Sequence, residues 1–272
     1  MITNTKIGYN GRLGNQMFQF ASIVGIARRN NLNVKFPFNE TPTNQSFADG
    51  IIRKVFNELN LAFNIPTEFF SNNIIVHNNY NEEYFHFNEH IFNTIKDDTN
   101  MDGYFQSEKY FEHIEDEIKS LFTFKQNIYS IAKNNFPNTD LETVSIHIRM
   151  GDYKFSNVHP VCNNEFYKNA IEKHFSDKPY YFIIFSDEIE QAKNMILITD
   201  NIMYIDTNNS YVELCMMTMC NHNIIANSSF SWWGAWLNPN ENKKVIAPNK
   251  WFTGTYSDVN VSDIYCGDWI IL

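Results

Sequence analysis

Short apolar runs alternate with segments of helical spacing from residue 143 to residue 247, and this alternation constrains the fold more than any other feature. The apolar runs are too short for helices and predict buried strands at residues 143–148, 180–185, 202–205, 223–226 and 245–247. Helices are predicted between them, at residues 163–175, 187–195, 211–219 and 229–237. Strands that alternate with helices predict a parallel, doubly wound sheet, so the fold class is α/β.

The first half of the chain has a weaker pattern of the same kind. It predicts a strand at residues 6–9, a loop at 10–14, a helix at 15–29 and a strand at 33–36. Residues 41–124 are less regular, with helical stretches at 51–59 and 108–122. A polar stretch at 134–140 contains Pro137 and is the predicted boundary between two α/β domains, residues 1–138 and 139–272.

The charge and the cysteines exclude several classes of protein. A formal net charge of -10 argues against a nucleic-acid partner, although an anionic small ligand needs only one or two well-placed cations. No apolar run reaches roughly 18 residues and the first residues lack a signal-peptide core, so we expect no transmembrane segment. The cysteines lack paired zinc spacing, and Cys215 and Cys220 read as buried thiols. A reducing, cytoplasmic location is predicted, with any membrane contact made through the substrate.

Polar residues follow the predicted strands at the edge where α/β sheets bind ligands. His147 and Arg149 are two apart on one strand and therefore point to the same face. The planar guanidinium of Arg149 suits a diphosphate, and Asp152 would either orient Arg149 or cap the next segment. The alternative is a surface salt bridge between Arg149 and Asp152 and a histidine satisfied within the core.

Two later strand ends carry further candidates. Asp187 and Glu188 follow the second strand and would accept hydrogen bonds from a guanine base, or would cap the next helix and supply its first-turn acids. Ser228 and Ser229 follow the fourth strand and begin a helix, which makes a second anion-binding terminus. The tryptophans that follow, Trp232, Trp233 and Trp236, read as core packing.

A glycine loop near the N-terminus, residues 11–19 with the sequence GRLGNQMFQ, enters a helix. The helix terminus suits an anion, or the loop is an ordinary turn with Asn15 near an N-cap position. The chain lacks an Asp-x-Asp after an apolar strand, and it lacks Gly-x-Ser-x-Gly, His-Glu-x-x-His and paired CxxC motifs. We therefore expect neither a metal nor a cofactor.

Four segments together resemble the bacterial α-1,2-fucosyltransferases of glycosyltransferase family 11: residues 11–19, 147–153, 185–188 and 227–237. They run in the family's order and span nearly the whole chain. The resemblance implies a GT-B-like fold, with two Rossmann-like α/β halves facing across a cleft. It also implies inverting, metal-independent transfer of L-fucose from GDP-L-fucose, bound by residues 139–272, to the O2 of a galactoside, with residues 1–138 mainly on the acceptor side.

The resemblance also implies roles for individual residues. By resemblance, Arg149 would grip the β-phosphate. Asp152 is a candidate for the catalytic base, or a brace for Arg149, on chemical grounds and not from the resemblance. The remaining residues implied to bind the donor, or to reach the donor or acceptor from the first domain, are His147, Asp187 or Glu188, Ser228, Ser229, the backbone of Phe230, Gly14 and Asn15.

The chain departs from the family pattern in two places. Met150 stands where members often have a second arginine, and the Asp187-Glu188 pair replaces a common Asp-Asp. The expected partners are GDP-L-fucose and a galactose-containing oligosaccharide or lipid-linked glycan. The alternatives are a fucosyltransferase of another linkage and a catalytically inactive relative that binds carbohydrate or nucleotide. The sequence does not predict the oligomeric state.

Overall fold

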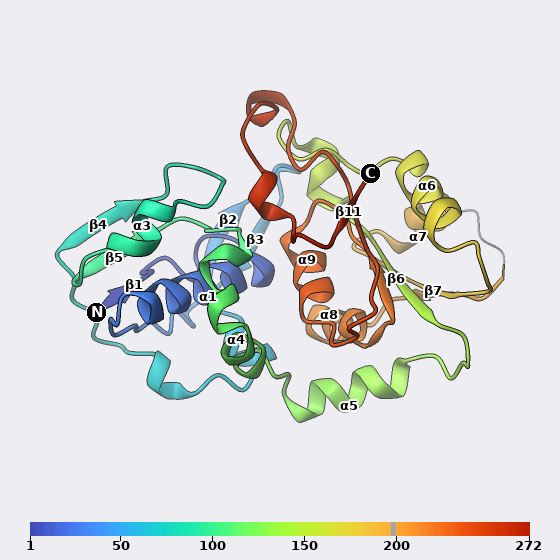
Figure 1. Cartoon of the computed structure of the whole chain (residues 1–272). Coiled ribbons are helices and arrows are strands. Elements are labelled where there is room, and N and C mark those ends of the chain that lie inside the picture. The colour runs from blue at the N-terminus through green and yellow to red at the C-terminus, as the bar shows by residue number, and fades with distance from the viewer. Residues whose placement is uncertain (197–199) are drawn as a thin grey trace. The chain divides into compact units, whose positions relative to one another are not determined.

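The computed structural model describes residues 1–196 and 200–272, and the chain divides into two compact units (Figure 1). The first unit comprises Met1–Ser46, Ile52–Lys125 and Val259–Cys266. The second comprises Phe47–Ile51, Gln126–Asp258 and Gly267–Leu272. The division into domains 1–138 and 139–272 that the sequence suggests stays a prediction.

The second unit is built on a parallel sheet of six strands. The predicted parallel sheet is therefore confirmed, and each predicted strand lies within two residues of an observed one. The central strand is buried at every residue, which explains its continuous apolar sequence. In order across the sheet, the strands are β11 (Ile270–Ile271), β10 (Val245–Ala247), β9 (His222–Ile224), β6 (Thr143–Ile148), β7 (Tyr181–Ser186) and β8 (Ile202–Ile205).

Helices cover both faces of this sheet (Figure 1). On one face, Tyr167 and Ala170 of α6 (Asn164–His174) and Ala192 of α7 (Ile189–Ala192) pack on the apolar side chains of the strands. The other face carries α8 (Ser210–Met219), which contacts α5 (Gln126–Asn135) and α9 (Ser229–Trp236). The helix predicted at 187–195 is confirmed only as the short α7, because Glu188 is not helical and the chain turns after Ala192.

Buried amides join α8 and α9 to the sheet. Asn223 of β9 donates to the hydroxyl of Ser145 over 2.7 Å and to the carbonyl of Met217 over 3.0 Å. Asn238 donates to the Asn223 side-chain oxygen over 2.8 Å. Trp232 and Trp233 are fully buried beside them, which confirms that the tryptophans pack in the core. All four cysteines are free thiols, and Cys215 and Cys220 are buried as predicted.

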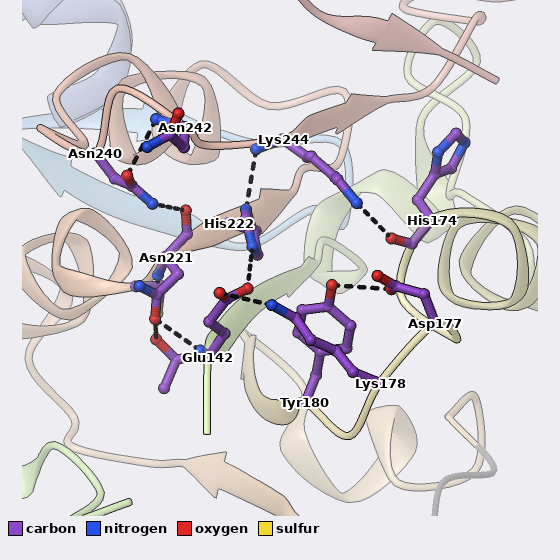
Figure 2. A network of polar contacts seen from close by, with 12 residues as sticks. Glu142, His174, Asp177, Lys178, Tyr180, Asn221, His222, Asn240, Asn242 and Lys244 are labelled. Carbon is purple, nitrogen blue, oxygen red and sulfur yellow. Dashed lines mark hydrogen bonds and ion pairs between the residues drawn. The ribbon is translucent and has the colours of Figure 1, made fainter. Parts of the chain in front are cut away.

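A polar network closes the amino edge of the same sheet, before β6, β9 and β10 (Figure 2). His222 Nδ1 accepts from the backbone N–H of Lys244 over 3.0 Å, so its Nε2 carries the proton and donates to Glu142 over 3.0 Å. Glu142 also pairs with Lys178 at 2.7 Å. The hydrogen bonds from Lys178 and His222 lower the pKa of Glu142. The network ties strand ends together at the edge opposite the polar residues of interest, so its role is structural.

The first unit contains a parallel sheet of three strands in the order β1 (Ile2–Thr3), β5 (Thr99–Asp102) and β4 (Asn78–Asn81). Its long helix is α1 (Leu13–Arg29), in which every residue from Gln16 to Ala27 is buried. A helix buried all round needs an apolar core around it, and phenylalanines supply that core. The Phe20 ring lies within 6.3 Å of the rings of Phe36, Phe69, Phe70 and Phe122, measured between centroids.

Several elements predicted in the first half are wrong. Residues 6–9 form a turn instead of a strand, because Gly8 has a positive φ of 89° and Tyr9 N–H donates to Lys6 over 2.8 Å. The helix predicted at 51–59 is instead the strand β3 (Ile52–Val55), which pairs with β2 (Thr43–Ser46). An Asp-Gly turn joins these two strands and is a signal typical of a hairpin. Residues 33–36 form only isolated bridges.

The remaining elements of the first unit are short. Residues 108–122 are helical only in three pieces, with Phe111 outside helical geometry between the first two. Val259–Cys266 belongs to this unit, where Asp263 pairs with Lys109 at 2.6 Å and accepts from Phe87 N–H over 3.0 Å. The short elements are α2 (Leu59–Ala62), η1 (Thr67–Phe69), α3 (Glu89–Thr94), η2 (Glu108–Tyr110), η3 (Glu112–Ile114), α4 (Glu115–Leu121) and η6 (Ser262–Ile264).

Within the described ranges, no helix is both long and apolar enough to cross a membrane.

Candidate active site

The candidate site lies at the carboxyl edge of the six-stranded sheet, where the strand order changes direction. From β6 the chain proceeds to β7 and β8 on one side and then returns to β9 on the other. Parallel sheets bind ligands at such a switch point. Arg149 follows β6 and Asn227 follows β9, so the sheet brings these two segments of the chain to adjacent strand ends.

Arg149 is the buried cation that follows β6 and is only 7% exposed. Its guanidinium forms ion pairs with Asp152 and with Asp187, one through each terminal nitrogen. Burying a charge is costly unless it is paired, and these two carboxylates make the buried position of Arg149 possible. A guanidinium has five N–H donors, so this pairing leaves others for an anionic ligand, since Arg149 has no further hydrogen-bond partner among the described residues.

The carboxylate of Asp187 lies close to the backbone of Met150 and Gly151, where it also meets Arg149. One carboxylate oxygen pairs with Arg149, and the other accepts from Met150 N–H over 2.9 Å. A Cβ added at Gly151 would lie 2.3 Å from the Asp187 oxygen, so any side chain there would displace the carboxylate. Both oxygens of Asp187 are therefore engaged in bracing the turn after β6.

Glu188 has a different environment from Asp187. It precedes α7, with its side chain 3.3 Å from Lys154 Nζ and accepting from Gln191 over 3.1 Å. Its side chain is 36% exposed, against 27% for Asp187. Glu188 is thus the acid of the pair that a ligand reaches without breaking an ion pair to Arg149.

Tyr153 is a site residue for which the sequence suggested no role. It lies in η4 (Gly151–Phe155), with its ring 4.9 Å from the guanidinium carbon of Arg149. The ring of His159 stacks on Tyr153, with 4.7 Å between centroids. Burial lowers the pKa of His159, the Asp152 carboxylate opposes this change and the charge of Arg149 adds to it. The sequence marked Tyr153 only as the last residue of the segment 147–153, without indicating this contact.

His147 and the start of α9 complete the edge. His147 is buried, its carbonyl accepts from the hydroxyl of Tyr167 over 3.0 Å, and its ring lies 5.7 Å from that of Phe230. Ser228 occupies the N-cap of α9 without a capping side-chain hydrogen bond, and the first turn of the helix has no acidic residue. The partial positive charge of this terminus is therefore not offset by a local carboxylate.

The segment before α9 is fixed by Asn227. Its side chain donates to the carbonyls of Pro160 and Trp251, each over 3.0 Å, and its own carbonyl accepts from Tyr153 over 3.3 Å. These bonds connect the start of α9 to the segment that follows Arg149. The three strand ends that the sequence singled out, at Arg149, Asp187 and Ser228, thus belong to one edge of one sheet.

Gly14 and Asn15 lie in the first unit. Helix α1 begins at Leu13 with Arg12 as its N-cap, so Asn15 lies in the first turn of the helix, three residues after the cap. Asn15 is partly exposed, and its side-chain oxygen accepts from Gln106 over 2.9 Å. Gln106 follows β5, far along the chain, and the sequence gave no indication of this partner.

No group of three or more His, Cys, Asp or Glu side chains within residues 1–196 and 200–272 is arranged to hold a metal ion.

The chain is a glycosyltransferase with an α/β fold of the GT-B class. Residues 2–272 match the model of glycosyl transferase family 11, and the chain therefore belongs to that family. The family resemblance seen in the sequence is confirmed, as is the expected fold class.

Two curated relatives come from Escherichia coli. The O-antigen biosynthesis glycosyltransferase WbnK is 28% identical over 305 aligned positions, which cover 97% of this chain and 98% of WbnK. An alpha-1,2-colitosyltransferase is 35% identical over 182 positions, which cover 61% of this chain and 60% of that protein.

Two solved fucosyltransferase structures match this chain. POFUT1 in complex with GDP-fucose matches with a TM-score of 0.53 and 11% identity, covering 89% of this chain and 95% of that one. Fucosyltransferase NodZ from Bradyrhizobium matches with a TM-score of 0.49 and 11% identity, covering 86% and 91%. At this identity the likeness to POFUT1 concerns the fold alone.

Proposed function

We propose that this enzyme transfers L-fucose from GDP-L-fucose to the O2 of a galactose residue, with inversion and without a metal. The acceptor is a galactose-containing oligosaccharide or lipid-linked glycan. Family membership supports the glycosyltransferase chemistry. The observation that carries the donor assignment is the buried Arg149, braced by two carboxylates at the switch point of the second unit's sheet.

The diphosphate is the part of the donor that this edge fits best. Arg149 keeps N–H donors beyond those that Asp152 and Asp187 take, and its charge is permanent. The start of α9, with Ser228, Ser229 and the backbone of Phe230, supplies further donors and a helix dipole of the right sign. Both groups lie at the carboxyl ends of adjacent strands.

The reaction is a single displacement at the anomeric carbon of fucose. The acceptor oxygen forms a bond to that carbon and releases its proton to solvent, while the bond from the carbon to the β-phosphate oxygen breaks and GDP leaves. Negative charge therefore grows on the diphosphate, and Arg149 stabilises it more strongly in the transition state than in the bound donor. Asp152, already paired with Arg149, acts as a brace and not as the base.

The guanosine end of the donor is assigned to His147 and Glu188. Asp187 has both oxygens engaged, whereas Glu188 is more exposed and has only side-chain partners. A carboxylate in this position accepts from guanine N1–H and the exocyclic amine. Gly14 and Asn15, which lie in the first unit, are assigned to contacts with the donor or the acceptor.

The relative that transfers colitose favours a second candidate donor. The alpha-1,2-colitosyltransferase is 35% identical over the matched positions. Colitose is 3-deoxy-L-fucose, so the two GDP sugars differ by one hydroxyl. A site that hydrogen-bonds a substrate hydroxyl discriminates strongly against the analogue that lacks it. GDP-colitose is therefore the competing donor.

The test measures GDP release from GDP-L-fucose and from GDP-colitose with a panel of β-galactosides, in the presence of EDTA. We expect turnover of GDP-L-fucose that survives the chelator, and a product in which fucose is attached to galactose O2. Preferred turnover of GDP-colitose would contradict the assignment of GDP-L-fucose as the donor. A product with a different linkage would contradict the assignment of galactose O2 as the acceptor atom.

A variant test addresses Arg149 itself. Arg149→Ala removes the charge that stabilises the leaving diphosphate, so turnover should fall on the order of 10²–10³-fold. Arg29→Ala removes an exposed arginine of α1 and is the matched control. Near-full turnover by Arg149→Ala would contradict the assignment.

A further inference from the structure

Glu82 directly follows β4, and its side chain reaches the turn that follows β5. Its backbone N–H donates to Asp102 over 2.8 Å, which continues the pairing of the two strands. Its carboxylate then accepts two backbone hydrogen bonds, from Tyr104 N–H over 2.7 Å and from Phe105 N–H over 2.9 Å. One carboxylate thus holds two consecutive peptide groups of this turn.

The turn that Glu82 holds has an unusual backbone. Phe105 is a buried residue with a positive φ of 52°, a conformation unfavourable for a side chain of this size. A Cβ added at Gly103 would lie 2.4 Å from Glu82 Cβ, so only glycine lets the two strand ends approach. The Phe105 carbonyl accepts from Ser22 of α1 over 2.8 Å. These contacts keep the turn in a strained conformation.

The same turn carries two side chains that hold the start of α1. The hydroxyl of Tyr104 donates to the Asn10 side chain over 2.8 Å. The amide of Gln106 donates to the Asn15 side-chain oxygen over 2.9 Å. Asn10 and Asn15 flank the glycine loop that enters α1, so the turn supplies a hydrogen-bond partner on each side of this loop.

Glu82 titrates close to neutral pH. Burial raises its pKa to about 7, the Asp102 carboxylate adds to this, and the hydrogen bonds from Tyr104 and Phe105 oppose it. A protonated carboxyl would present an O–H to one of two N–H donors. The titratable and charged groups around it are Tyr80 on β4, Glu83 beside it, Asp102 at the end of β5, Lys6 paired with Asp102, Tyr104 in the turn and Tyr110 of η2.

We propose that Glu82 is a positioning residue of the transferase, whose ionised carboxylate holds the Tyr104–Phe105 turn and, through Gln106, fixes the side chain of Asn15. The proposal rests on the proposed function, in which Asn15 contacts the donor or the acceptor. Glu82 acts through the turn and not on the substrate, because both its oxygens accept backbone hydrogen bonds.

The first experiment is the pH profile of fucosyl transfer by the wild type, Glu82→Gln and Glu83→Gln. The wild type should lose activity as the pH falls through about 7, reaching roughly a tenth of its plateau one unit below that pKa. Glu82→Gln should lack this limb and show a lower kcat, with an unchanged dissociation constant for GDP. Glu83→Gln removes a neighbouring exposed charge and should keep the wild-type profile. A limb near pH 7 that persists in Glu82→Gln would overturn the proposal.

A second experiment does not depend on activity. The side-chain amide signals of Asn15 and Gln106, identified by replacing each residue, are followed by NMR between pH 5.5 and about 8.5, spanning the raised pKa. They should titrate together near pH 7 in the wild type and in Glu83→Gln, and not in Glu82→Gln. Signals that ignore Glu82 would overturn the proposal. If no acceptor accepts fucose, the proposed function fails, while this titration still decides the role of Glu82.

A further variant covers the case in which Glu82→Gln does not fold. Gln106→Ala keeps Glu82 and the turn and removes only the contact with Asn15. It should lower kcat with little change in the Michaelis constant for the donor, and it should abolish the pH response of the Asn15 amide. Wild-type kcat in Gln106→Ala would overturn the proposal.

Discussion

Asp187 and Arg149 join the ends of two neighbouring strands, because the carboxylate at the end of β7 pairs with the guanidinium that follows β6. The position of the Arg149 guanidinium therefore depends on a residue from another strand as well as on its own segment. Asp152, three residues from Arg149, supplies the second, local brace. Geometry of this kind matters because a group that stabilises a transition state must be held in position before the reaction.

Asp187→Asn should slow the reaction more than it weakens binding. The loss of a carboxylate makes the edge more positive, which favours GDP, but it also loosens Arg149. We therefore expect kcat to fall about tenfold with a small change in the dissociation constant for GDP. Stability should fall by about 1–3 kcal/mol, measured by urea unfolding. Glu188→Gln changes the neighbouring, more exposed acid and should cost less than about 1 kcal/mol. Equal stability losses in both variants would contradict this.

Gly151→Ala should reproduce the effect of Asp187→Asn. The new methyl group would lie 2.3 Å from the Asp187 oxygen and would push that carboxylate away from Arg149. We expect a stability loss of about 1–3 kcal/mol and a similar drop in kcat. The double variant with Asp187→Asn should be less than additive, since both changes break one contact. Gly267→Ala is the control, because nothing lies within 4 Å of its Cβ position. Additive stability losses in the double variant would mean that Gly151→Ala does not act through the Asp187 carboxylate.

Replacing Tyr153 separates its ring from its hydroxyl. Tyr153→Phe keeps the ring beside Arg149 and loses one hydrogen bond to Asn227, so stability should fall by about 0.5–1.5 kcal/mol with little change in GDP affinity. Tyr153→Leu also removes the cation–π contact and the stacking on His159, for a further ~0.5–2 kcal/mol. Calorimetry of unfolding and of GDP binding measures both. A larger effect from Tyr153→Phe would mean that the hydroxyl matters more than the ring.

The second unit could be predicted from the sequence because its signals are local. Residues 143–148, 202–205 and 245–247 are apolar runs bounded by polar turns, and the observed strands have the same limits. The order of the strands could not be predicted, since alternation permits several. The pairing of Asp187 with Arg149 depends on that order and on the absence of a side chain at Gly151.

The first unit was harder because its contacts are distant in sequence. The strand predicted at residues 6–9 is a turn, since the apolar pattern there reflects the buried Ile7 and not a strand. Gln106 meets Asn15 across 91 residues, and Glu82 holds a turn that begins 22 residues later. Periodicity carries no information on such pairs. Gly103 is compatible with a close contact between chain segments, but the sequence does not indicate that the contact is with Glu82.

The contribution of Glu82 to folding stability should fall as the pH rises from about 4.5 to about 7, through the titration of its carboxyl group. Its pKa is raised from 4.5 to about 7 in the folded protein, so between these values the folded chain keeps a proton that the unfolded chain has lost. At this group the folded state therefore binds more protons, and the contribution of Glu82 to stability decreases with pH across this window, by at most about 3 kcal/mol. Glu82→Gln removes the titration, so the stability difference between this variant and the wild type should change with pH, while Glu83→Gln should run parallel to the wild type. Urea unfolding at a series of pH values measures the free energy of unfolding of the wild type and both variants. A wild type and a Glu82→Gln variant with parallel profiles would show that Glu82 keeps an ordinary pKa, and that the carboxylate is ionised throughout.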